Sequence, residues 1–516
     1  MKLPIPATTE IKRISQTLAT SIDEFATLLK NVTVEMVEGK PRASRRLGIE
    51  VIANGDASVE AISPSFGRGI HWGATTATGG IYIANYNTVY ANTYLSPIGT
   101  FGAGITIQQN QKMFFADVND GTYDAVVIDP TTNSGAALDL LNLTFTSIAA
   151  AFPLIVNAGG VWLNGRFFIC GDNKIYNSDL NDVTAGYTDF VSAERDGDTI
   201  VAIVKHHDHI VALGVNSTEF FYHDDNPGAT GSPLRRRQDI YYNIGLLDMA
   251  AFDSANDVIY FLGFGDKEGV GLYRITNFQL EKISDARFDR WIGGNRSDTS
   301  ALNYLAVSEY EGRTLVFITH ADIASGQADF DDHLYTFVFE EDGRNYVWDT
   351  DGIGELSEFP VVGATHINAR VAGGGSMAGG TERFNRLIMA NGDVVTFRNR
   401  YDAPDTFKDD LGTRAGFNTS IEFPDFDGDM TGWKFCHAVE PYGEYEDDCE
   451  FTLSWRDEGG AYNTPHTLTK ESRQRVVSCG RFSRRKFRLN SIDNSATIDE
   501  HMEIGGLDAD IEPGTY

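Results

Sequence analysis

The sequence has few basic residues and no long apolar segment. Its 516 residues include 42 Lys and Arg against 73 Asp and Glu, a formal net charge of −31. A classical nucleic-acid-binding domain needs a basic excess to displace counterions from phosphates, so that class is disfavoured, although a local basic patch is not excluded. No apolar run reaches the roughly 18 residues of a membrane span, and residues 1–13 lack the apolar core of a signal peptide. We therefore expect a soluble protein without a membrane anchor, made in a cytoplasm.

Cysteine is also scarce, and the common catalytic motifs are missing. The four cysteines form no CxxC pair, which disfavours a disulfide scaffold or zinc knuckle and predicts reduced thiols; a disulfide among the last three is the open alternative (Cys170, Cys436, Cys449 and Cys479). There is no nucleophile elbow, no Walker loop and no HExxH motif. We expect no enzymatic activity, no cofactor and no bound metal.

Short alternating strands separated by turn residues dominate the chain from about residue 50 to 400. The sequence has 52 glycines but only 15 prolines, and 42% of its residues are hydrophobic. In residues 161–176, for example, three short apolar runs are joined by Asn164-Gly165 and by 171–173. These turns supply the positive φ angles that tight β-hairpins require. The pattern predicts an all-β fold.

The strand groups return at intervals of very roughly 40–50 residues, which is the blade period of a β-propeller. No strict blade signature repeats, so we expect degenerate blades, six in number with seven as the alternative. Two packed β-sandwiches would produce similar local patterns. The predicted fold is an all-β, degenerate β-propeller over residues 49–404.

The two ends of the chain differ from this central region. Apolar residues in 9–29 recur at three- and four-residue spacing, which predicts a helix, and 31–38 alternate like a strand. We expect residues 1–48 to form an N-terminal arm that packs on the C-terminal domain or on a neighbouring subunit. After a polar linker near 402–410, residues 405–516 contain further short strands and predict a separate β-sandwich.

Two motifs suggest metal ligands but have simpler interpretations. Lys205-His-His-Asp-His209 lies between two apolar strands, where a polar hairpin turn is expected anyway. Asp425, Asp427 and Asp429 alternate as in a calcium loop, but an EF-hand also needs Gly at loop position six and Glu at position twelve, where Met430 and Cys436 stand. An acidic turn is favoured over a weak calcium site.

The basic residues that do occur are clustered. Such clusters in an acidic protein mark contacts with an acidic partner surface or pair with nearby acids. We select six arginines as candidate subunit or partner contacts (Arg45, Arg46, Arg481, Arg484, Arg485 and Arg488), and note a further cluster at Arg235–Arg237.

Several segments, taken in order, resemble the tail-hub or nozzle proteins of short-tailed phages, including the packaged-DNA stabilisation proteins of lambdoid short-tailed phages. The similarity lies in an early strand followed by Arg46-Leu-Gly-Ile49, where the family has Arg-Pro-Gly-Leu, and in 164–222. It continues at Asn243-Ile-Gly245, and the strands at 454–460 and 480–485 are also similar. These motifs are structural, and none is catalytic.

The resemblance implies a non-enzymatic virion protein of the phage tail, assembled in the host cytoplasm as a homohexameric ring. The ring would continue the DNA channel below the portal and its adaptor, meet a distal plug, needle or fibre protein, and touch double-stranded DNA only transiently and without specificity. It would retain packaged DNA and conduct it during ejection.

The alternative is a propeller-headed receptor-binding or glycan-degrading tail protein. For that alternative, the nearest Asp-box-like segment is 454–462, which carries one extra residue and occurs once. A cellular propeller scaffold is a third class.

An acidic channel wall would repel phosphates, whereas a ring of basic residues would hold them. We therefore expect acidic residues to contribute to the lumen, with these candidates: Asp425, Asp427, Asp429, Glu444, Glu446, Asp447 and Asp448.

Overall fold

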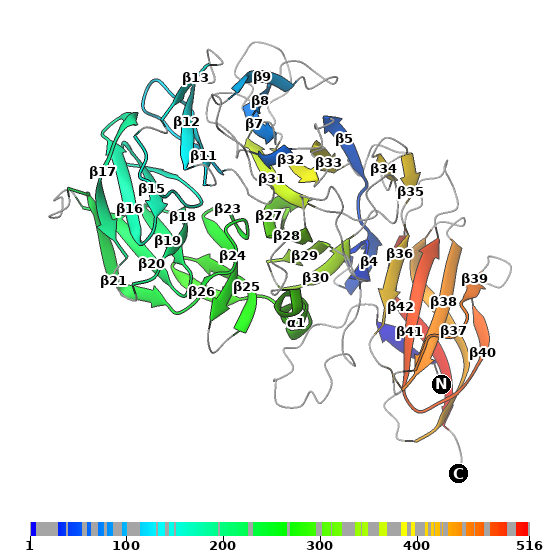
Figure 1. Cartoon of the computed structure of the whole chain (residues 1–516). Helices are drawn as coiled ribbons and strands as arrows, with labels where there is room; N and C mark the ends of the chain where they lie inside the picture. Colours follow the sequence, from blue (N-terminus) through cyan, green and yellow to red (C-terminus); the bar gives the residue numbers. More distant parts are fainter. Residues whose placement is uncertain are drawn as a thin grey trace.

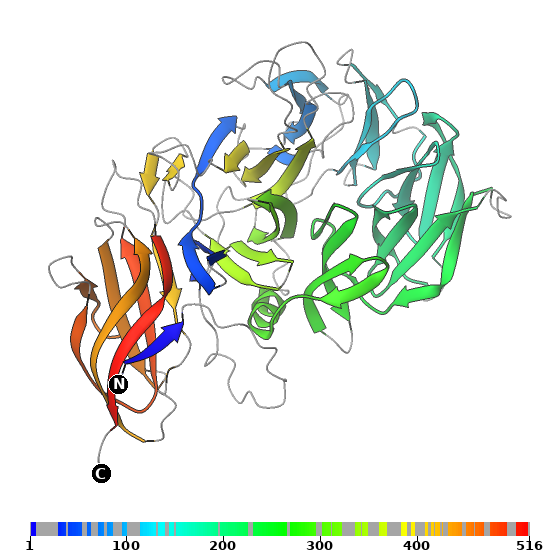
Figure 2. The same cartoon turned by 180° about the vertical axis from the view of Figure 1, so that it is seen from behind.

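The computed structural model shows an almost entirely β-stranded protein (Figures 1 and 2). It describes residues 2–6, 29–37, 40–53, 59–62, 71–76, 80–85, 95–100, 114–130, 133–139, 144–148, 151–193, 197–224, 231–265, 269–295, 302–310, 312–321, 336–341, 343–348, 361–368, 383–389, 394–397, 408–410, 414–416, 418–423, 426, 432–445, 450–458, 460–468, 475–492 and 502–513. Within these ranges the helix is α1 (Ala286–Asn295), and no helix there is long and apolar enough to cross a membrane.

Five successive sheets are antiparallel and built mainly from strands that follow one another in the chain. The first two contain β6 (Val59–Ile62), β7 (His71–Thr76), β8 (Gly80–Asn85) and β9 (Leu95–Thr100), then β10 (Phe114–Asp117), β11 (Ala125–Asp129), β12 (Ser134–Asp139) and β13 (Thr144–Ser147). The next two contain β14 (Val161–Leu163), β15 (Arg166–Gly171), β16 (Lys174–Asp179) and β17 (Asp182–Ser192), then β18 (Ile200–His206), β19 (His209–Gly214), β20 (Thr218–His223) and β21 (Leu234–Tyr242). The fifth contains β22 (Gly245–Leu246), β23 (Phe252–Ala255), β24 (Val258–Gly265), β25 (Gly269–Thr276) and β26 (Gln279–Lys282).

Two further groups continue the succession but recruit strands from distant parts of the chain. One consists of β27 (Leu302–Tyr310), β28 (Arg313–Ala321), β29 (Thr336–Glu340) and β30 (Asn345–Trp348). The other consists of β31 (Val361–Asn368), β32 (Arg383–Met389) and β33 (Val394–Phe397), and its fourth strand is β5 (Ile49–Ala53), beside β34 (Lys408–Asp410) and β35 (Arg414–Gly416). The described residues therefore contain seven successive groups of four or five strands, while the number of blades in a closed ring stays a prediction.

The hairpin between β14 and β15 illustrates why the local pattern was informative. Asn164 and Gly165 have φ angles of 49° and 76°. Two successive positive φ angles make the primed turn whose twist matches the strands on either side. A Cβ at Gly165 would also lie 2.7 Å from Oδ1 of Asn181, so this position requires glycine for two reasons.

The C-terminal unit is a pair of packed sheets (Figure 1). One sheet joins β3 (Val32–Val37), β4 (Lys40–Arg45), β42 (Met502–Pro513), β37 (Lys434–Tyr445) and β40 (Val476–Phe482), while β1 (Lys2–Pro6) pairs with β42. The other joins β2 (Leu29–Lys30), β36 (Thr419–Glu422), β41 (Arg485–Ile492), β38 (Glu450–Asp457) and β39 (His466–Leu468). The predicted strand at 31–38 is confirmed as β3, whereas the predicted helix at 9–29 falls mostly outside the described residues.

One hydrophobic core fills the space between these two sheets and extends into the group β27–β30. It includes Val34 from the N-terminal segment, Trp348 from β30 and Phe487 from β41, all at most 3% exposed. The two regions that differ most in sequence therefore share a common interior. The polar contacts that accompany this core define the candidate site.

A candidate structural joint and the charged residues around it

The two-residue strand β2 connects a propeller sheet to the C-terminal unit. We call this connection, with the polar contacts around Asn31, Arg46 and Glu340, the joint. Lys30 is in parallel register with Val347 of β30, and it is antiparallel to Ser420 of β36. Through this one strand, β27–β30 and the strands β36, β41, β38 and β39 become a single nine-stranded sheet. A strand with partners on both edges cannot be removed without exposing the backbone groups of both neighbours.

Asn31 turns the chain immediately after β2. Its φ of 54° lies in the left-handed region, which Asn tolerates better than most residues because its short polar side chain bonds locally. Its backbone N–H donates to the Val347 carbonyl at 2.9 Å, and its side-chain Nδ2 donates to the Asn418 carbonyl at 3.0 Å. Asn31 is fully buried, and its two hydrogen bonds reach both of the regions that β2 connects.

Arg46 lies in the interior beside this turn. It is fully buried, and its guanidinium donates to Oδ1 of Asn31 at 3.2 Å and to the Leu47 carbonyl at 3.0 Å. The same guanidinium lies 5.8 Å from the ring centroid of Trp348, a cation–π distance. Its neighbour Arg45 is 1% exposed and donates to Oγ of Ser491 at 2.7 Å. Both side chains are thus bonded inside the chain, and a contact of Arg45 or Arg46 with a partner stays a prediction.

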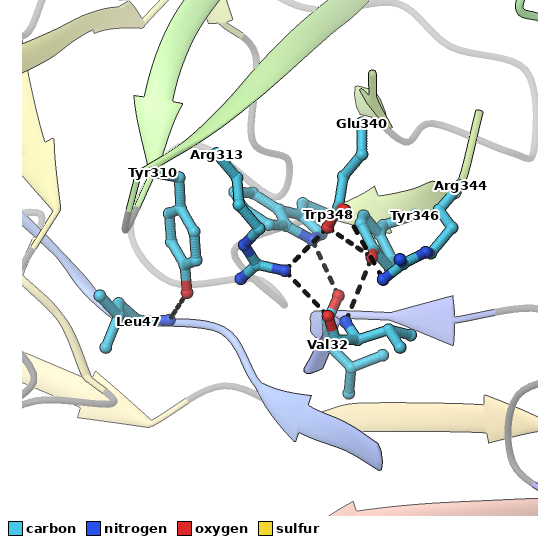
Figure 3. A network of polar contacts seen from close by, with 9 residues as sticks. Val32, Leu47, Tyr310, Arg313, Glu340, Arg344, Tyr346 and Trp348 are labelled. Atoms are coloured by element: carbon cyan, nitrogen blue, oxygen red, sulfur yellow. Dashed lines mark hydrogen bonds and ion pairs between the residues drawn. The ribbon is translucent and has the colours of Figure 1, made fainter. Parts of the chain in front are cut away.

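A second set of contacts surrounds the carboxylate of Glu340 at the end of β29 (Figure 3). Arg313 donates to Oε1 of Glu340 at 2.9 Å and to the Val34 carbonyl at 2.9 Å. The Tyr346 hydroxyl donates to the same Oε1 at 2.7 Å and accepts the Val34 N–H at 3.2 Å, and Arg344 lies 3.8 Å from Oε2. The Glu340 side chain is only 7% exposed. Burial, together with the adjacent Glu340 charge, raises the pKa of Tyr346, so its hydroxyl stays protonated and can donate.

Aromatic side chains with polar tips complete the joint (Figure 3). The Tyr310 hydroxyl accepts the Leu47 N–H at 2.7 Å, and Trp348 Nε1 donates to the Val32 carbonyl at 3.3 Å. The rings of Tyr310 and Trp348 are 5.6 Å apart between centroids. Each aromatic residue thus buries apolar area against the sheet and also satisfies a backbone group of the N-terminal segment.

The arginines of 481–488 divide into two kinds. Arg485 is 2% exposed, and its Nε lies 2.7 Å from Oδ1 of Asp457, so its guanidinium is bonded within the chain. Arg488 is partly buried and bonds to Glu422. Burial alone would raise the pKa of Glu422, but the hydrogen bond and charge of Arg488 and the charge of Lys486 together lower it. Arg484 is half-buried, and Arg481 is exposed with its guanidinium 4.4 Å from the Trp433 ring centroid. Arg481, Arg484 and Arg488 retain the prediction of a partner surface.

The cluster on β21 also pairs with local acids. Three ion pairs are present: Arg235 with Asp224 at 3.3 Å, Arg236 with Glu219 at 3.3 Å and Arg237 with Asp239 at 2.8 Å. These pairs neutralise most of the basic charge of the strand within its own sheet.

Most of the predicted acidic lumen residues fall outside the described residues: Asp425, Asp427, Asp429, Glu446, Asp447 and Asp448. Glu444 lies in β37, in register with Glu503 of β42. The Glu503 carboxylate forms an ion pair with Arg42 at 3.3 Å. The position of the predicted lumen residues relative to a channel remains a prediction.

The histidine-rich segment forms the predicted hairpin tip between β18 and β19, but it is less exposed than predicted. His206 is fully buried, and its Nε2 accepts the backbone N–H of Phe278 at 3.2 Å. Burial, and then the charge of His207, lower the pKa of His206. No cluster of potential metal ligands occurs in the ranges that the structure describes. The histidines here hold two sheets together through Phe278 at the tip between β25 and β26.

The sequence did not indicate the contacts that make the joint. Glu340, Arg313 and Tyr346 lie in ordinary strand patterns, and the backbone groups that Arg313 and Tyr346 bond to are 279 and 312 residues away in the sequence. One feature of the sequence pointed to these contacts: Tyr310 and Trp348 are the last residues of β27 and β30. A buried tyrosine or tryptophan usually forms a hydrogen bond through its polar atom.

A succession of small antiparallel sheets defines the class of this protein as β-propeller. Residues 67–322, just under half of the chain, match the family model described as "Bacteriophage P22 Gp10, beta-propeller". The family suspected from the sequence is thereby confirmed over these residues, and the match supports a phage structural protein.

Two solved structures are also similar, at low identity. Raptor from Chaetomium thermophilum is 11% identical with a TM-score of 0.40; the match covers 69% of this chain and 29% of Raptor. The Pan2 WD40 domain from Neurospora crassa is 12% identical with a TM-score of 0.37, over 69% of this chain and 96% of that domain. At these scores neither likeness bears on function. The sequence matches no curated protein.

Proposed function

We propose that six copies of this chain form the ring-shaped hub, or nozzle, of a short-tailed phage tail. The ring continues the DNA channel below the portal and its adaptor, retains the packaged DNA, and conducts it during ejection. The observation that carries the proposal is the family match over residues 67–322. The protein would act in the virion, as a structural component with no chemical step.

The joint supports this role because a ring that holds pressurised DNA must transmit force between its parts. The propeller and the C-terminal unit share strand β2 and one hydrophobic core instead of being joined only by a flexible linker. The buried polar groups at the contact specify one arrangement, since another arrangement would leave a buried charge such as Arg46 without its hydrogen bonds. A rigid subunit can then meet its neighbours through different patches, head to tail, as a ring requires.

The placement of the basic residues also suits a DNA channel. Arg45, Arg46, Arg485 and Lys434 are at most 2% exposed, so their charges are withdrawn from the surface. Each chain carries a net charge of −31, and in a ring every surface group is repeated. About six to ten phosphate contacts change DNA affinity about 10³–10⁵-fold between 50 and 200 mM salt, so a single exposed basic ring would hold the duplex. An acidic channel wall instead lets the DNA duplex slide.

The test is to mix the full-length protein with an adaptor-bearing portal and image the complex end-on. We expect a six-fold ring coaxial with the portal. Binding of single copies at the periphery, or no binding, would argue instead for a receptor-binding protein or a scaffold.

The role of the N-terminal segment is tested by two deletions. Removing residues 1–6 deletes β1 alone, whereas removing residues 1–30 also deletes β2. We expect the longer deletion to abolish ring formation while the sheets β10–β26 remain folded, and the shorter deletion to weaken rings less. Sedimentation showing intact rings for the longer deletion would contradict this role.

A further inference from the structure

Two buried cysteines lie on neighbouring strands of the C-terminal unit. Cys436 is in β37 and Cys479 is in β40, and they are 2% and 3% exposed. Both belong to the core between the two sheets. In the antiparallel register, Cys436 is opposite Gly480, the residue that follows Cys479.

A β-bulge turns Cys479 toward Cys436. The register shifts between Cys436 and Ala438, so that two residues of β40, Ser478 and Cys479, occupy the space of one on β37. Ser478 and Gly480, on either side of Cys479, have φ angles of 63° and 81°. In a regular strand the neighbour of a cross-strand partner points to the opposite face, but here both thiols point into the same interior.

The two thiols differ in their surroundings. The Cys436 thiol donates to the Ala438 carbonyl at 3.6 Å, and the Cys479 thiol donates to the Val476 carbonyl at 3.8 Å. The interaction between the two thiols, together with burial, raises the pKa of Cys436. The same interaction lowers the pKa of Cys479 against the effect of burial, and the positive charge of Arg485 adds to the lowering. Arg485 is held close, since its Nη1 donates to the Cys479 carbonyl at 2.6 Å. A thiol beside a fixed cation is the arrangement that favours the nucleophilic thiolate.

We propose that Cys436 and Cys479 are a redox-sensitive pair that forms a disulfide between β37 and β40. In the structure both thiols are free, so it represents the reduced form. The oxidant is a small disulfide such as glutathione disulfide. The Cys479 thiolate attacks it to give a mixed disulfide and releases one small thiolate. Cys436 then loses its proton, attacks the Cys479 sulfur and releases the second small thiol, so two protein thiols become one disulfide.

Access to the pair comes from the position of β40, which ends the described path of its sheet. An edge strand opens locally more readily than a central one, and this opening exposes Cys479 to the oxidant. Once formed, the disulfide fixes the edge strand to β37 and restricts the unfolded chain between residues 436 and 479. The inference does not depend on the proposed tail function, because it concerns the stability of the C-terminal unit in an oxidising medium.

The experiment treats the folded full-length protein with glutathione disulfide and maps its disulfides by peptide mass spectrometry. We expect one linked peptide that joins residues 436 and 479, and a thermal unfolding midpoint about 2–4 °C higher than in the reduced protein. Both effects should disappear in Cys436→Ser and in Cys479→Ser, and both should persist in Cys170→Ser and Cys449→Ser. Cys170 is the matched control, since it is fully buried and its thiol contacts the Ala158 carbonyl.

Because a serine substitution could unfold the C-terminal unit, near-ultraviolet circular dichroism of each reduced variant is recorded first. Alkylation rates of the wild-type protein provide a second readout. We expect iodoacetamide to modify Cys479 about tenfold faster than Cys170. A folded protein that forms no 436–479 link after oxidation, or that links Cys449 instead, would overturn the proposal.

Discussion

The sheets between residues 114 and 282 and the C-terminal unit are built in opposite ways. In the first region nearly all strands pair with their neighbours in sequence, as β14 to β17 do. In the second, β42 pairs with β37, with β4 and with β1, so that both ends of the chain meet in one sheet. Local hairpins form a sheet with short loop closures, whereas the C-terminal unit needs contacts across almost the whole chain. The second region is therefore held together by contacts between segments far apart in the sequence, including the buried polar contacts of the joint.

The largest effect is expected from Arg46→Ala at the joint. The change removes two buried hydrogen bonds, to Asn31 and Leu47, and leaves a cavity beside Trp348. We expect a loss of about 2–4 kcal/mol in the free energy of unfolding of the C-terminal unit, measured by hydrogen exchange on peptides from β3 and β4. The matched control is Arg481→Ala, which removes an exposed arginine and should cost less than about 0.5 kcal/mol. Equal losses in the free energy of unfolding would show that the buried Arg46 stabilises the unit no more than the exposed Arg481 does.

A second variant tests the carboxylate at the centre of the network. Glu340→Gln keeps the shape of the side chain but removes the charge that Arg313 and Tyr346 contact. We expect a loss of about 1–3 kcal/mol in the same unit, because a buried charge loses its partner. Glu281→Gln breaks the more exposed pair with Arg274 and should cost about 0–1 kcal/mol by the same measurement. A larger loss of stability for Glu281→Gln than for Glu340→Gln would contradict the expectation that the buried contacts of the joint matter more than exposed ion pairs.

A third variant perturbs the locally built region. Gly165→Ala places a Cβ at a φ of 76° and against Asn181, and should cost about 1–2 kcal/mol, confined to peptides of β14 to β17. Gly197→Ala has a similar φ of 60° but nothing near the added Cβ, so it isolates the backbone strain. If Gly165→Ala also loosened β3 and β4, the two regions would not be independent.

The smallest effect is a pH dependence at the His206 contact. Nε2 of His206 accepts a hydrogen bond from the Phe278 N–H, so the folded state needs the neutral ring. Because the folded pKa is lowered by burial, the unfolded chain binds the proton more readily, and the contact loses stability as the pH falls below the ordinary histidine pKa of about 6.5 toward the folded value. The protection of the peptide around residue 278 against hydrogen exchange, relative to the intrinsic rate at each pH, should fall between pH 7 and 5. His206→Gln should reduce this dependence, whereas His437→Gln, on an exposed strand face, should leave it unchanged.

The same contrast explains what could be predicted from the sequence. The turn at Asn164-Gly165 and the strands beside it follow from local residue preferences, so the all-β fold and most hairpins were predicted correctly. Arg45, Arg46 and Arg485 were assigned to a partner surface because their charge suggested exposure, yet each is buried and bonds to acceptors within the chain, for Arg45 to Ser491 at the other end of the sequence. Periodicity in one strand cannot reveal which remote backbone group a side chain will meet. The short connecting strand β2 was also hidden, since two residues carry no alternation.

The most direct test of the account is a cryo-electron microscopy map of the virion tail determined with six-fold averaging. We expect six copies of the chain in a ring directly beneath the adaptor, each with its propeller and C-terminal unit joined through β2 as in the single chain. A map in which the chain lies only on peripheral fibres, or in which the two regions are separated within one subunit, would contradict the account.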